Sequence, residues 1–284
     1  MSITEGFQFS QSSLQDFVDC RRRFQLRYIE RLSWPAIESE PALQHERFIQ
    51  RGSQFHHMVQ QHLVGVPAER LGDMLQDEAL ARWWENYLQF QQTLTGLDDL
   101  ELSGARRLPE VSLSAPLAGF RLMAKYDLIL IADNGNVVII DWKTSPQQPK
   151  RDRLANRLQT RVYPYLFVAA GTQLNQGNQP NPDALEMVYW YGEYPESPIR
   201  FPYSLDKFRK DQEYLQDLIQ TIQDLPEDQF YLTTNDRQCT YCVYRSLCNR
   251  GGQAGSLEDW EIDLETGVDS QVIIDFEQIA EIEF

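Results

Sequence analysis

The chain has 284 residues, of which 42% are apolar and 12% aromatic, and this composition excludes an intrinsically disordered protein. Its 26 Lys and Arg residues against 42 Asp and Glu residues give a net charge of −16, which argues at first against nucleic acid as a partner. No apolar run reaches about 18 residues and the N-terminus lacks the pattern of a signal peptide, so the sequence predicts a cytoplasmic protein that does not bind a membrane.

The first third of the chain has the apolar periodicity of helices. Ser12 or Ser13 is placed to cap a helix that runs to about Leu32 and contains Cys20. Two further helices are predicted at about 42–63 and 69–92. We therefore expect a helical N-terminal part over about residues 10–105.

The middle of the chain changes to segments rich in Val, Ile and Leu, which are typical of strands. Strands are predicted at 110–117, 120–132 and 137–143, and the last two contain continuous apolar runs, as expected for strands buried on both faces. A helix, a loop, two strands and a helix are then predicted at about 153–170, 171–182, 185–191, 199–203 and 205–224. This order predicts an α/β core over about residues 106–225, with helices on both faces of a sheet.

Residues 133–135, Asp-Asn-Gly, are a strong hairpin signal between the two apolar strands. A two-residue turn over 134–135 would place Asp127 opposite Trp142, on the other face of the sheet from Asp141. A three-residue turn with its glycine in the left-handed region would pair 132 with 136 and place Asp127 opposite Asp141. We predict the three-residue turn, which puts both acids on one face.

Lys143 lies two residues after Asp141 and therefore points to the same face of its strand. Two carboxylates that converge beside a backbone carbonyl form an oxygen-rich site of the kind that binds Mg²⁺ or Mn²⁺. A lysine beside such a metal can orient or deprotonate a water molecule and stabilise developing negative charge. This arrangement suits phosphodiester hydrolysis, and the alternative is a structural ion pair of Asp127, Asp141 and Lys143 near the strand ends.

Two predicted helices carry polar residues that can complete this site. Gly52 lies inside a helix, where glycine costs about 1 kcal/mol relative to alanine, so a close approach of another segment is expected there. His56 can supply a nitrogen ligand to a metal such as Mn²⁺, and the alternative is a partly buried helix residue. Gln159 and Tyr163 share one helix face because they are four residues apart, and the alternative for both is an ordinary place on a helix.

The chain has four cysteines, and a reducing compartment argues against disulfides between them. Cys239 and Cys242 have a spacing at which two thiolates bind one metal centre, Cys248 follows after five residues, and Cys20 lies near the N-terminus. Using all four favours one four-thiolate site that clasps the N-terminal helix to the segment 239–248. Zinc and an iron–sulfur cluster both accept four thiolates, and a buried unpaired Cys20 or disulfides are the other possibilities.

In this order the motifs resemble the RecB-type branch of the PD-(D/E)XK nucleases, and within it the iron–sulfur members. Those members include CRISPR-associated RecB-like exonucleases and the AddB nuclease domain of helicase–nuclease complexes. The resemblance covers about residues 8–250 and rests on six segments. They are the opening helix with Cys20, Gly52-x-x-x-His56, Asp127, Asp141-Trp142-Lys143, Gln159-x-x-x-Tyr163, and the closing Cys239, Cys242 and Cys248.

The resemblance implies a restriction-endonuclease-like fold, with a central mixed sheet flanked by helices. It also implies N-terminal helices and a C-terminal cysteine segment, held together by a four-cysteine cluster. The cluster would be 4Fe–4S, with zinc as the alternative, on Cys20, Cys239, Cys242 and Cys248. The nuclease domain would span residues 1–250 and be followed by a C-terminal tail, residues 251–284.

The resemblance further implies roles for the residues of the site. The metal ligands would be His56, Asp127, Asp141 and the carbonyl of Trp142. Lys143 would serve the attacking water, and Gln159 and Tyr163 would hold the DNA strand. These roles describe a nuclease whose active site takes residues from helices on both sides of one hairpin.

The function implied is that of a Mg²⁺- or Mn²⁺-dependent DNA nuclease, in the first place an exonuclease. It would act on DNA with a single-stranded end in repair, recombination or CRISPR-related processing. The alternative is a catalytically silent DNA-binding or scaffold subunit of a helicase–nuclease complex, against which the intact Asp127, Asp141 and Lys143 argue. No P-loop motif is present, so a partner helicase would unwind the DNA, and a CRISPR adaptation protein is the other expected partner.

The acidity of the chain is regional. The segment 251–284 has ten acidic residues and no Lys or Arg, and without it the net charge is −6. From 121 to 170, eight basic residues stand against four acidic ones. Because the acidity is concentrated in the tail, the initial objection to nucleic acid reduces to a question about this segment. The tail is either a solvated appendage or a segment that competes with DNA or binds a partner.

Overall fold

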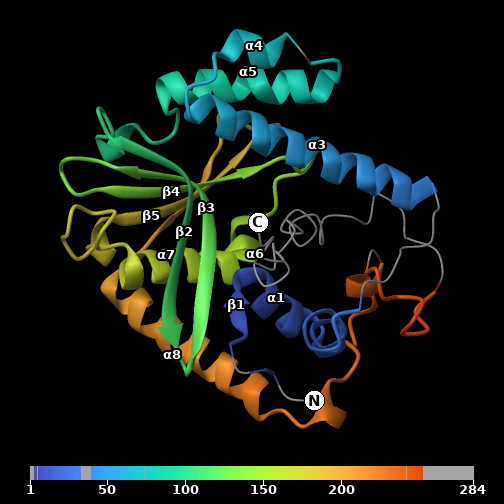
Figure 1. Cartoon of the computed structure of the whole chain (residues 1–284). Helices are drawn as coiled ribbons and strands as arrows, with labels where there is room; N and C mark the ends of the chain where they lie inside the picture. The colour runs from blue at the N-terminus through green and yellow to red at the C-terminus, as the bar shows by residue number, and fades with distance from the viewer. Residues whose placement is uncertain (1–2, 5, 33–39, 74, 241, 252–284) are drawn as a thin grey trace, which may run out of the picture.

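The computed structural model describes the chain except for residues 1–2, 5, 33–39, 74, 241 and 252–284, and the side chains of 40–46 are also outside the description. The described strands form one mixed sheet in the order β1–β3–β4–β5–β6, with β2 also paired to β3 (Figure 1). The strands are β1 (Gln8–Ser10), β2 (Arg106–Leu117), β3 (Phe120–Ile131), β4 (Val137–Lys143), β5 (Leu185–Tyr191) and β6 (Ile199–Pro202). The predicted mixed sheet flanked by helices is confirmed, while the acidic tail lies outside the described residues.

Strand β3 organises the sheet because both of its edges are paired. Along one edge it pairs with β2 in an antiparallel hairpin. The other edge is shared: β1 pairs in parallel with residues 121–123, and β4 pairs antiparallel with residues 128–131. Strand β4 then pairs in parallel with β5 over its whole length. The N-terminal segment and the β3–β4 hairpin are therefore neighbours on the same strand.

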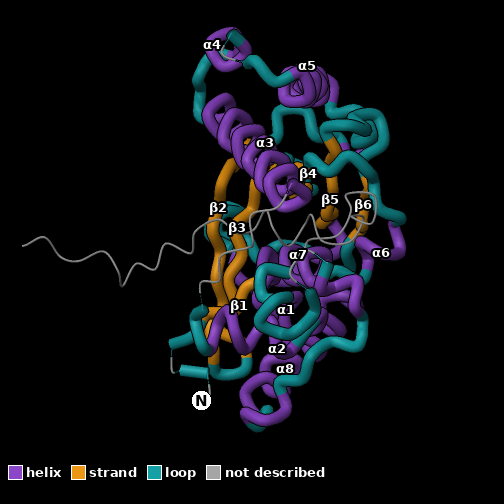
Figure 2. Tube along the Cα trace, turned by 90° about the vertical axis from the view of Figure 1, so that its right-hand side faces the viewer, coloured by secondary structure: helices purple, strands orange, loops and turns teal. Residues whose placement is uncertain are grey.

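Helices cover both faces of the sheet (Figures 1 and 2). Val137 and Ile139 of β4 pack in one core, with α1 (Gln11–Asp19), α7 (Leu158–Ala170) and α8 (Leu205–Asp224). Val138 and Ile140 pack in the other core, with α3 (Glu40–Leu63) and α5 (Glu78–Thr93). The prediction that these strands are buried on both faces is confirmed, since the strand alternates between two apolar cores.

The N-terminal helix differs from the prediction at both its start and its length. Ser10, and not Ser12 or Ser13, caps α1, in a capping box with Ser13. The helix ends at Asp19, because Cys20 has an extended backbone with φ −159° and ψ 107°. A four-residue helix α2 (Arg21–Phe24) and a π-helical turn (Gln25–Ile29) follow. The preceding strand β1 has only three residues and was not predicted.

Two further predicted helices are each divided in two. The segment 69–92 contains α4 (Ala68–Gly72) and α5, which begins where Asp77 accepts a hydrogen bond from Leu80 N at 3.0 Å. The segment 153–170 contains α6 (Arg151–Ala155) and α7, separated by extended backbone at Arg157. Strands β4 and β5 and helix α8 have the predicted bounds. In the described part of the chain, no helix combines the length and apolarity that crossing a membrane requires.

Candidate active site

The β3–β4 hairpin determines where the two acids of the site lie. Ala132 N donates to Asn136 O at 2.9 Å, and Gly135 inside the turn has φ +89°, a conformation that favours glycine. The predicted three-residue turn is therefore confirmed. The observed register runs from Ile131 opposite Val137 to Leu128 opposite Ile140, and the next residues along the two strands are Asp127 and Asp141. Asp141 contacts Gln159 of α7, and Asp127 contacts His56 of α3.

Lys143 and Gln159 surround the carboxylate of Asp141. Lys143 Nζ lies 3.0 Å from Asp141 Oδ2, and the side chains of the two residues are 14% and 6% exposed. Gln159 Nε2 donates to Asp141 Oδ1 at 2.6 Å, while its Oε1 accepts from Lys143 Nζ at 3.1 Å. Burying an ion pair carries a desolvation cost that further hydrogen bonds offset, and Gln159 provides one such bond to each partner.

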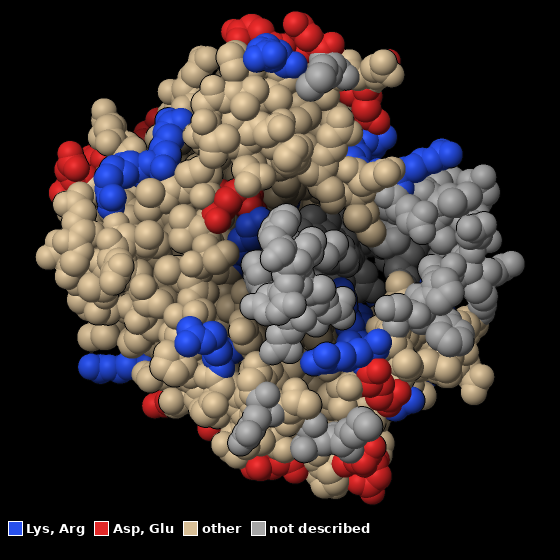
Figure 3. All heavy atoms as spheres, in the orientation of Figure 1, with Lys and Arg blue, Asp and Glu red and all other residues tan. Residues whose placement is uncertain are grey.

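His56 reaches the same site from α3, on the other side of the hairpin. Its Nδ1 lies 3.4 Å from Asp127 Oδ1, and the backbone N–H of Trp142 donates to Asp127 Oδ2 at 2.9 Å. We call His56, Asp127, Asp141, Lys143 and Gln159 the active-site cluster. Figure 3 shows the molecule hollowed below α3, with acidic and basic side chains together at the edge of the hollow.

The charged side chains of the cluster shift the pKa values of their neighbours. Burial alone lowers the pKa of His56, but the charges of Asp127 and Asp141 and the hydrogen bond with Asp127 outweigh burial and raise it. For Asp127, burial raises the pKa, but His56, the Trp142 N–H and Lys143 together lower it. The cluster therefore stabilises an ionised Asp127 beside cationic neighbours.

The donor atoms of the cluster match the metal that the sequence suggests. Carboxylate oxygens suit Mg²⁺ and Mn²⁺, and an imidazole nitrogen is accepted by the softer of the two. In the described structure, no three His, Cys, Asp or Glu side chains form a group that could hold a metal ion. The chemistry of the residues fits a divalent metal, and the set of ligands stays a prediction.

Gly52 explains how α3 approaches the end of β4. A Cβ built on Gly52 would lie 2.8 Å from Thr144 Oγ1, closer than ordinary Cβ contacts permit. Thr144 is buried and directly follows Lys143. The close approach expected at this glycine is therefore found, and it places α3, with His56 one turn further on, against the strand that carries Asp141.

Tyr189 is a residue of the site that the sequence did not single out. Lys143 Nζ lies 5.6 Å from the centre of the Tyr189 ring, a distance at which a cation is attracted to the face of an aromatic ring. Tyr189 also exchanges a hydrogen bond of 2.8 Å with Thr160 of α7. Its strand was predicted, but the parallel register that pairs Tyr189 with Asp141 has no local signal in the sequence.

Gln159 and Tyr163 both lie on the buried side of α7. Gln159 is 9% exposed and Tyr163 3% exposed. The Tyr163 ring lies 4.9 Å from the ring of Tyr126, whose hydroxyl donates to Tyr163 O at 2.9 Å. The structure thus brings Gln159 into the active-site cluster, and the DNA contact implied for this pair stays a prediction.

The four cysteines lie in the two segments that the spacing connected. Cys20 separates α1 from α2, and the other three follow α8 in the segment 239–248, all as free thiols. Burial raises the pKa of Cys242 to about 11, and the charge of Cys20 contributes in the same direction. Cys20 also raises the pKa of Cys239 and Cys248, after the larger effect of their burial, so the thiols share one neighbourhood. No metal-holding group is found among the described residues, so the four-cysteine cluster stays a prediction.

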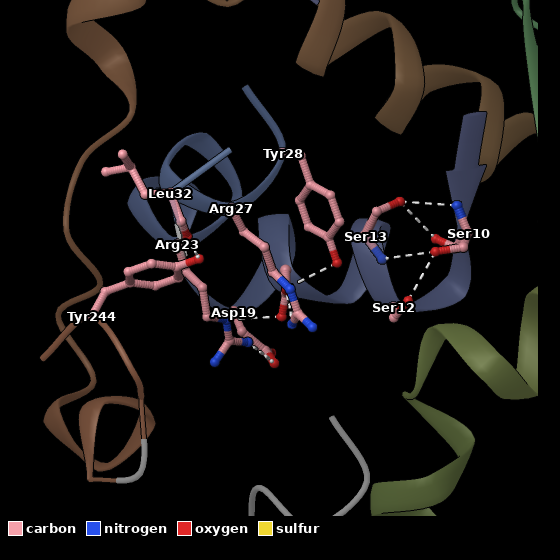
Figure 4. A network of polar contacts seen from close by, with 10 residues as sticks. Ser10, Ser12, Ser13, Asp19, Arg23, Arg27, Tyr28, Leu32 and Tyr244 are labelled. Carbon is pink, nitrogen blue, oxygen red and sulfur yellow. Dashed lines mark hydrogen bonds and ion pairs between the residues drawn. The ribbon is translucent and has the colours of Figure 1, made fainter. Parts of the chain in front are cut away.

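Contacts that involve no cysteine already join the N-terminal segment around Cys20 to the C-terminal part of the described chain. Phe230 stacks on Phe24 with ring centres 6.4 Å apart, and Arg22 N donates to Tyr231 O at 3.2 Å. The hydroxyl of Tyr244, from the cysteine segment, donates to Leu32 O at 2.7 Å (Figure 4). These aromatic and backbone contacts hold Cys20 near the segment 239–248.

Behind this junction lies a buried polar network in the N-terminal segment. Asp16, 1% exposed, lies 2.8 Å from Arg23 Nε and 3.1 Å from Arg27 Nη1, and it accepts from the hydroxyl of Tyr28 at 3.1 Å. Arg23 also pairs with Asp19 at 3.0 Å, part of the network drawn in Figure 4. The break at Cys20 is what allows Arg23 and Tyr28 to fold back onto α1.

Two solved structures and one protein-family model are similar to this chain. The crystal structure of a "Putative exonuclease" from Eubacterium rectale is 13% identical, with a TM-score of 0.46 over 76% of this chain and 79% of that one. The crystal structure of SSO0001 is 18% identical, with a TM-score of 0.39 over 87% of each chain. No curated protein matches the chain. A sequence profile described as the PD-(D/E)XK nuclease superfamily matches residues 8–249, which include the active-site cluster and all four cysteines.

Proposed function

The chain belongs to the PD-(D/E)XK nuclease superfamily, and from this premise we propose that it is a metal-dependent deoxyribonuclease that hydrolyses phosphodiester bonds. The observation that carries the proposal is the convergence of Asp127, Asp141 and Lys143: Asp127 accepts from the N–H of Trp142, which lies between Asp141 and Lys143, and Lys143 pairs with Asp141. A purely structural ion pair would need one acid and one base. Here His56 of α3 contacts Asp127, and Gln159 of α7 contacts Asp141, so each carboxylate has a partner from a different helix.

In the proposed mechanism, His56, Asp127, Asp141 and the carbonyl of Trp142 would hold Mg²⁺ or Mn²⁺. Such an ion, when bound, polarises a phosphoryl oxygen and lowers the pKa of a water molecule. Lys143, held beside Asp141, orients the attacking water and stabilises the negative charge that develops on the phosphate. The low exposure of these side chains strengthens each of these interactions, because little water screens them.

We propose further that the substrate is DNA with a single-stranded end and that the enzyme is an exonuclease. The resemblance to the RecB-type nucleases supports this proposal, together with the convergence of Asp127, Asp141 and Lys143. The resemblance supports a cytoplasmic role in repair, recombination or CRISPR-related processing, with a helicase or a CRISPR adaptation protein as partner. The division into a nuclease domain, residues 1–250, and an acidic tail, residues 251–284, belongs to the same proposal.

For the cysteines we propose a structural 4Fe–4S cluster on Cys20, Cys239, Cys242 and Cys248, with Zn²⁺ as the alternative. The donor set fits either centre, since both take four thiolates. The electrostatic contact of Cys20 with the other three thiols supports one shared site. A visible absorption band from thiolate-bound iron in the purified protein would favour the cluster, and colourless protein that contains zinc would favour the alternative.

The substitution Lys143→Ala tests the catalytic proposal. With Mg²⁺ or Mn²⁺ present, we expect cleavage of single-stranded DNA to fall by about 10²–10³-fold or more, because a positioned stabilising group is lost. Lys150→Ala, at an exposed lysine in the loop after β4, is the matched control and should cleave like the wild type. Wild-type cleavage by the Lys143→Ala protein would reject the proposal, and a wild type that binds DNA without cutting it would favour the scaffold alternative.

A second assay separates exonuclease from endonuclease activity. The wild type is given end-labelled linear and circular single-stranded DNA under the same conditions. An exonuclease degrades the linear DNA and leaves the circle intact. Cleavage of the circle at a comparable rate would contradict the exonuclease proposal while leaving the nuclease proposal in place.

A further inference from the structure

Gln159 lies in the first turn of α7 with its side-chain amide between the two charged residues of β4. Its Nε2 donates to Asp141 Oδ1 at 2.6 Å, and its Oε1 accepts from Lys143 Nζ at 3.1 Å. Lys143 Nζ in turn lies 3.0 Å from Asp141 Oδ2. The three side chains therefore close a ring in which each contacts the other two.

We propose that Gln159 is a positioning residue, which holds the carboxylate of Asp141 and the ammonium of Lys143 in the relative orientation that cleavage requires. This inference rests on the function proposed above. It gives Gln159 a different role from the DNA contact that the resemblance implies. In this role Gln159 acts on the reaction through Asp141 and Lys143 and not through the substrate.

The chemistry of a primary amide suits this position. An amide offers a donor group and an acceptor on neighbouring atoms without adding charge, so it can satisfy a carboxylate and an ammonium together. A glutamate at position 159 would place a second carboxylate against Asp141, and a methionine would offer no comparable hydrogen bond. A group that hydrogen-bonds to a metal-binding carboxylate fixes the orientation of that carboxylate. Loss of the Gln159 amide should therefore disturb both Asp141 and Lys143.

The surroundings of Gln159 favour positioning over DNA contact. The oxygens of a DNA phosphate are acceptors at neutral pH, so they can bind this side chain only through Nε2. That nitrogen already gives one of its two hydrogens to Asp141. The residue is also 9% exposed, and Tyr163, its partner in the motif, is 3% exposed.

The start of α7 is fixed from several directions, which makes it a precise base for a positioning side chain. Leu158 N donates to Gln15 Oε1 of α1 at 3.0 Å. Thr160 Oγ1 donates to Leu154 O of α6 at 2.6 Å and also contacts the hydroxyl of Tyr189 on β5. Arg161 pairs with Asp211 of α8 at 2.7 Å. A residue held between anchors of this kind keeps its rotamer, as a preorganised site requires.

The experiment compares Gln159→Met with the wild type in three measurements on the full chain. They are the single-turnover cleavage rate at saturating single-stranded DNA with Mn²⁺, the DNA dissociation constant with Ca²⁺ in place of Mn²⁺, and the dissociation constant of Mn²⁺ alone by electron paramagnetic resonance. Gln220→Met is the matched control, because Gln220 of α8 is exposed and also donates to an aspartate, Asp224. Circular dichroism checks that each protein is folded.

We expect Gln159→Met to slow cleavage about 100-fold and to weaken Mn²⁺ binding about 10–100-fold, with DNA affinity within about twofold of the wild type. In a Lys143→Ala background the same substitution should slow cleavage much less, because the two residues act as a unit. Gln159→Asn, which keeps the amide one methylene shorter, should give a smaller loss and replaces the methionine variant should that protein not fold.

A large loss of DNA affinity with an unchanged rate at saturating DNA would overturn the proposal in favour of DNA contact. Unchanged cleavage and unchanged Mn²⁺ affinity would overturn it in favour of ordinary helix packing. If the wild type binds Mn²⁺ but does not cleave DNA, the nuclease proposal fails, and the Mn²⁺ measurement still decides the role of Gln159. If the wild type binds no Mn²⁺, both proposals fail.

Discussion

The active-site cluster and the cysteine segment, residues 239–248, both join parts of the chain that are distant in sequence, but they are held in different ways. In the cluster, the sheet and two helices bring polar and charged side-chain atoms within 2.6–3.4 Å of one another. Near the cysteine segment, the rings of Phe24 and Phe230 stack, and Arg22 N donates to Tyr231 O just before the segment begins. The thiols of this junction form no metal-holding group among the described residues.

This difference follows from the kind of backbone that carries each set of side chains. The acids and the lysine of the cluster lie on paired strands, which fix the direction of every side chain. The three C-terminal cysteines lie on a short 3₁₀ turn and the turns that follow it. Paired strands can hold a charged site in place by themselves, whereas a segment of turns gains order from a ligand that binds it.

The comparison predicts the largest effect for loss of one cysteine. We expect Cys242→Ser to lower the free energy of unfolding by several kcal/mol and to remove the bound iron or zinc, because folding and metal binding are coupled at such sites. Denaturant unfolding followed by circular dichroism gives the first quantity, and elemental analysis the second. Lys143→Ala should show no comparable loss of stability, since its fold depends on the sheet.

Metal removal provides the control for the cysteine prediction. A chelator that strips the wild type should destabilise it to the level of Cys242→Ser and should leave the stability of that variant unchanged. Oxidative loss of the centre without loss of the fold would contradict the structural role. A wild type purified without iron or zinc would contradict the four-thiolate site itself.

Local signals in the sequence were enough to place the two acids. Three residues, Asp-Asn-Gly, specified the turn, and the turn specified a register that runs to Leu128 opposite Ile140, next to the two acids. Strands β4 and β5 have the predicted bounds, because each is a short segment rich in apolar and β-branched residues. His56 and Gln159 were also identified from their motifs, although spacing did not show that Gln159 contacts Lys143.

The rest depends on contacts between distant residues, which leave no local pattern. Helix α7 starts where Leu158 N donates to Gln15 Oε1, and these two residues are 143 positions apart in the sequence. Cys20 leaves the helical conformation although its neighbours on both sides are helical. Tyr189 meets Lys143 only because β5 pairs in parallel with β4, after a long connection. In each case tertiary structure overrides local preference.

Gly52→Ala tests whether the packing of α3 against β4 sets the geometry of the cluster. The added Cβ would lie 2.8 Å from Thr144 Oγ1, so the Thr144 side chain, the helix or the strand end must shift, and a shift of the helix moves His56 relative to Asp127. We expect cleavage to fall about 100-fold, as for a misplacement of about 1 Å. Stability should change little, because overpacking of about 1–3 kcal/mol is partly offset by the gain of about 1 kcal/mol in helix propensity.

The double substitution Gly52→Ala with Thr144→Ala is the control for this packing. Removing Oγ1 of Thr144 makes room for the new Cβ, so the double variant should regain most of the cleavage rate lost in Gly52→Ala. Cleavage by Gly52→Ala at the wild-type rate would show that the cluster does not depend on this contact. Equal loss in the single and double variants would attribute the loss to the helix itself.

The smallest effect is expected at the junction between the N-terminal and cysteine segments. Tyr244→Phe removes the hydroxyl that donates to Leu32 O at 2.7 Å, and loss of one such hydrogen bond costs about 1 kcal/mol of unfolding free energy. Tyr194→Phe is the control, because its hydroxyl also donates to a backbone carbonyl, that of Pro146, at a more exposed place. The Tyr244 variant should lose more stability than the Tyr194 variant. Equal losses would show that Tyr244 contributes to the junction no more than an exposed surface hydrogen bond does.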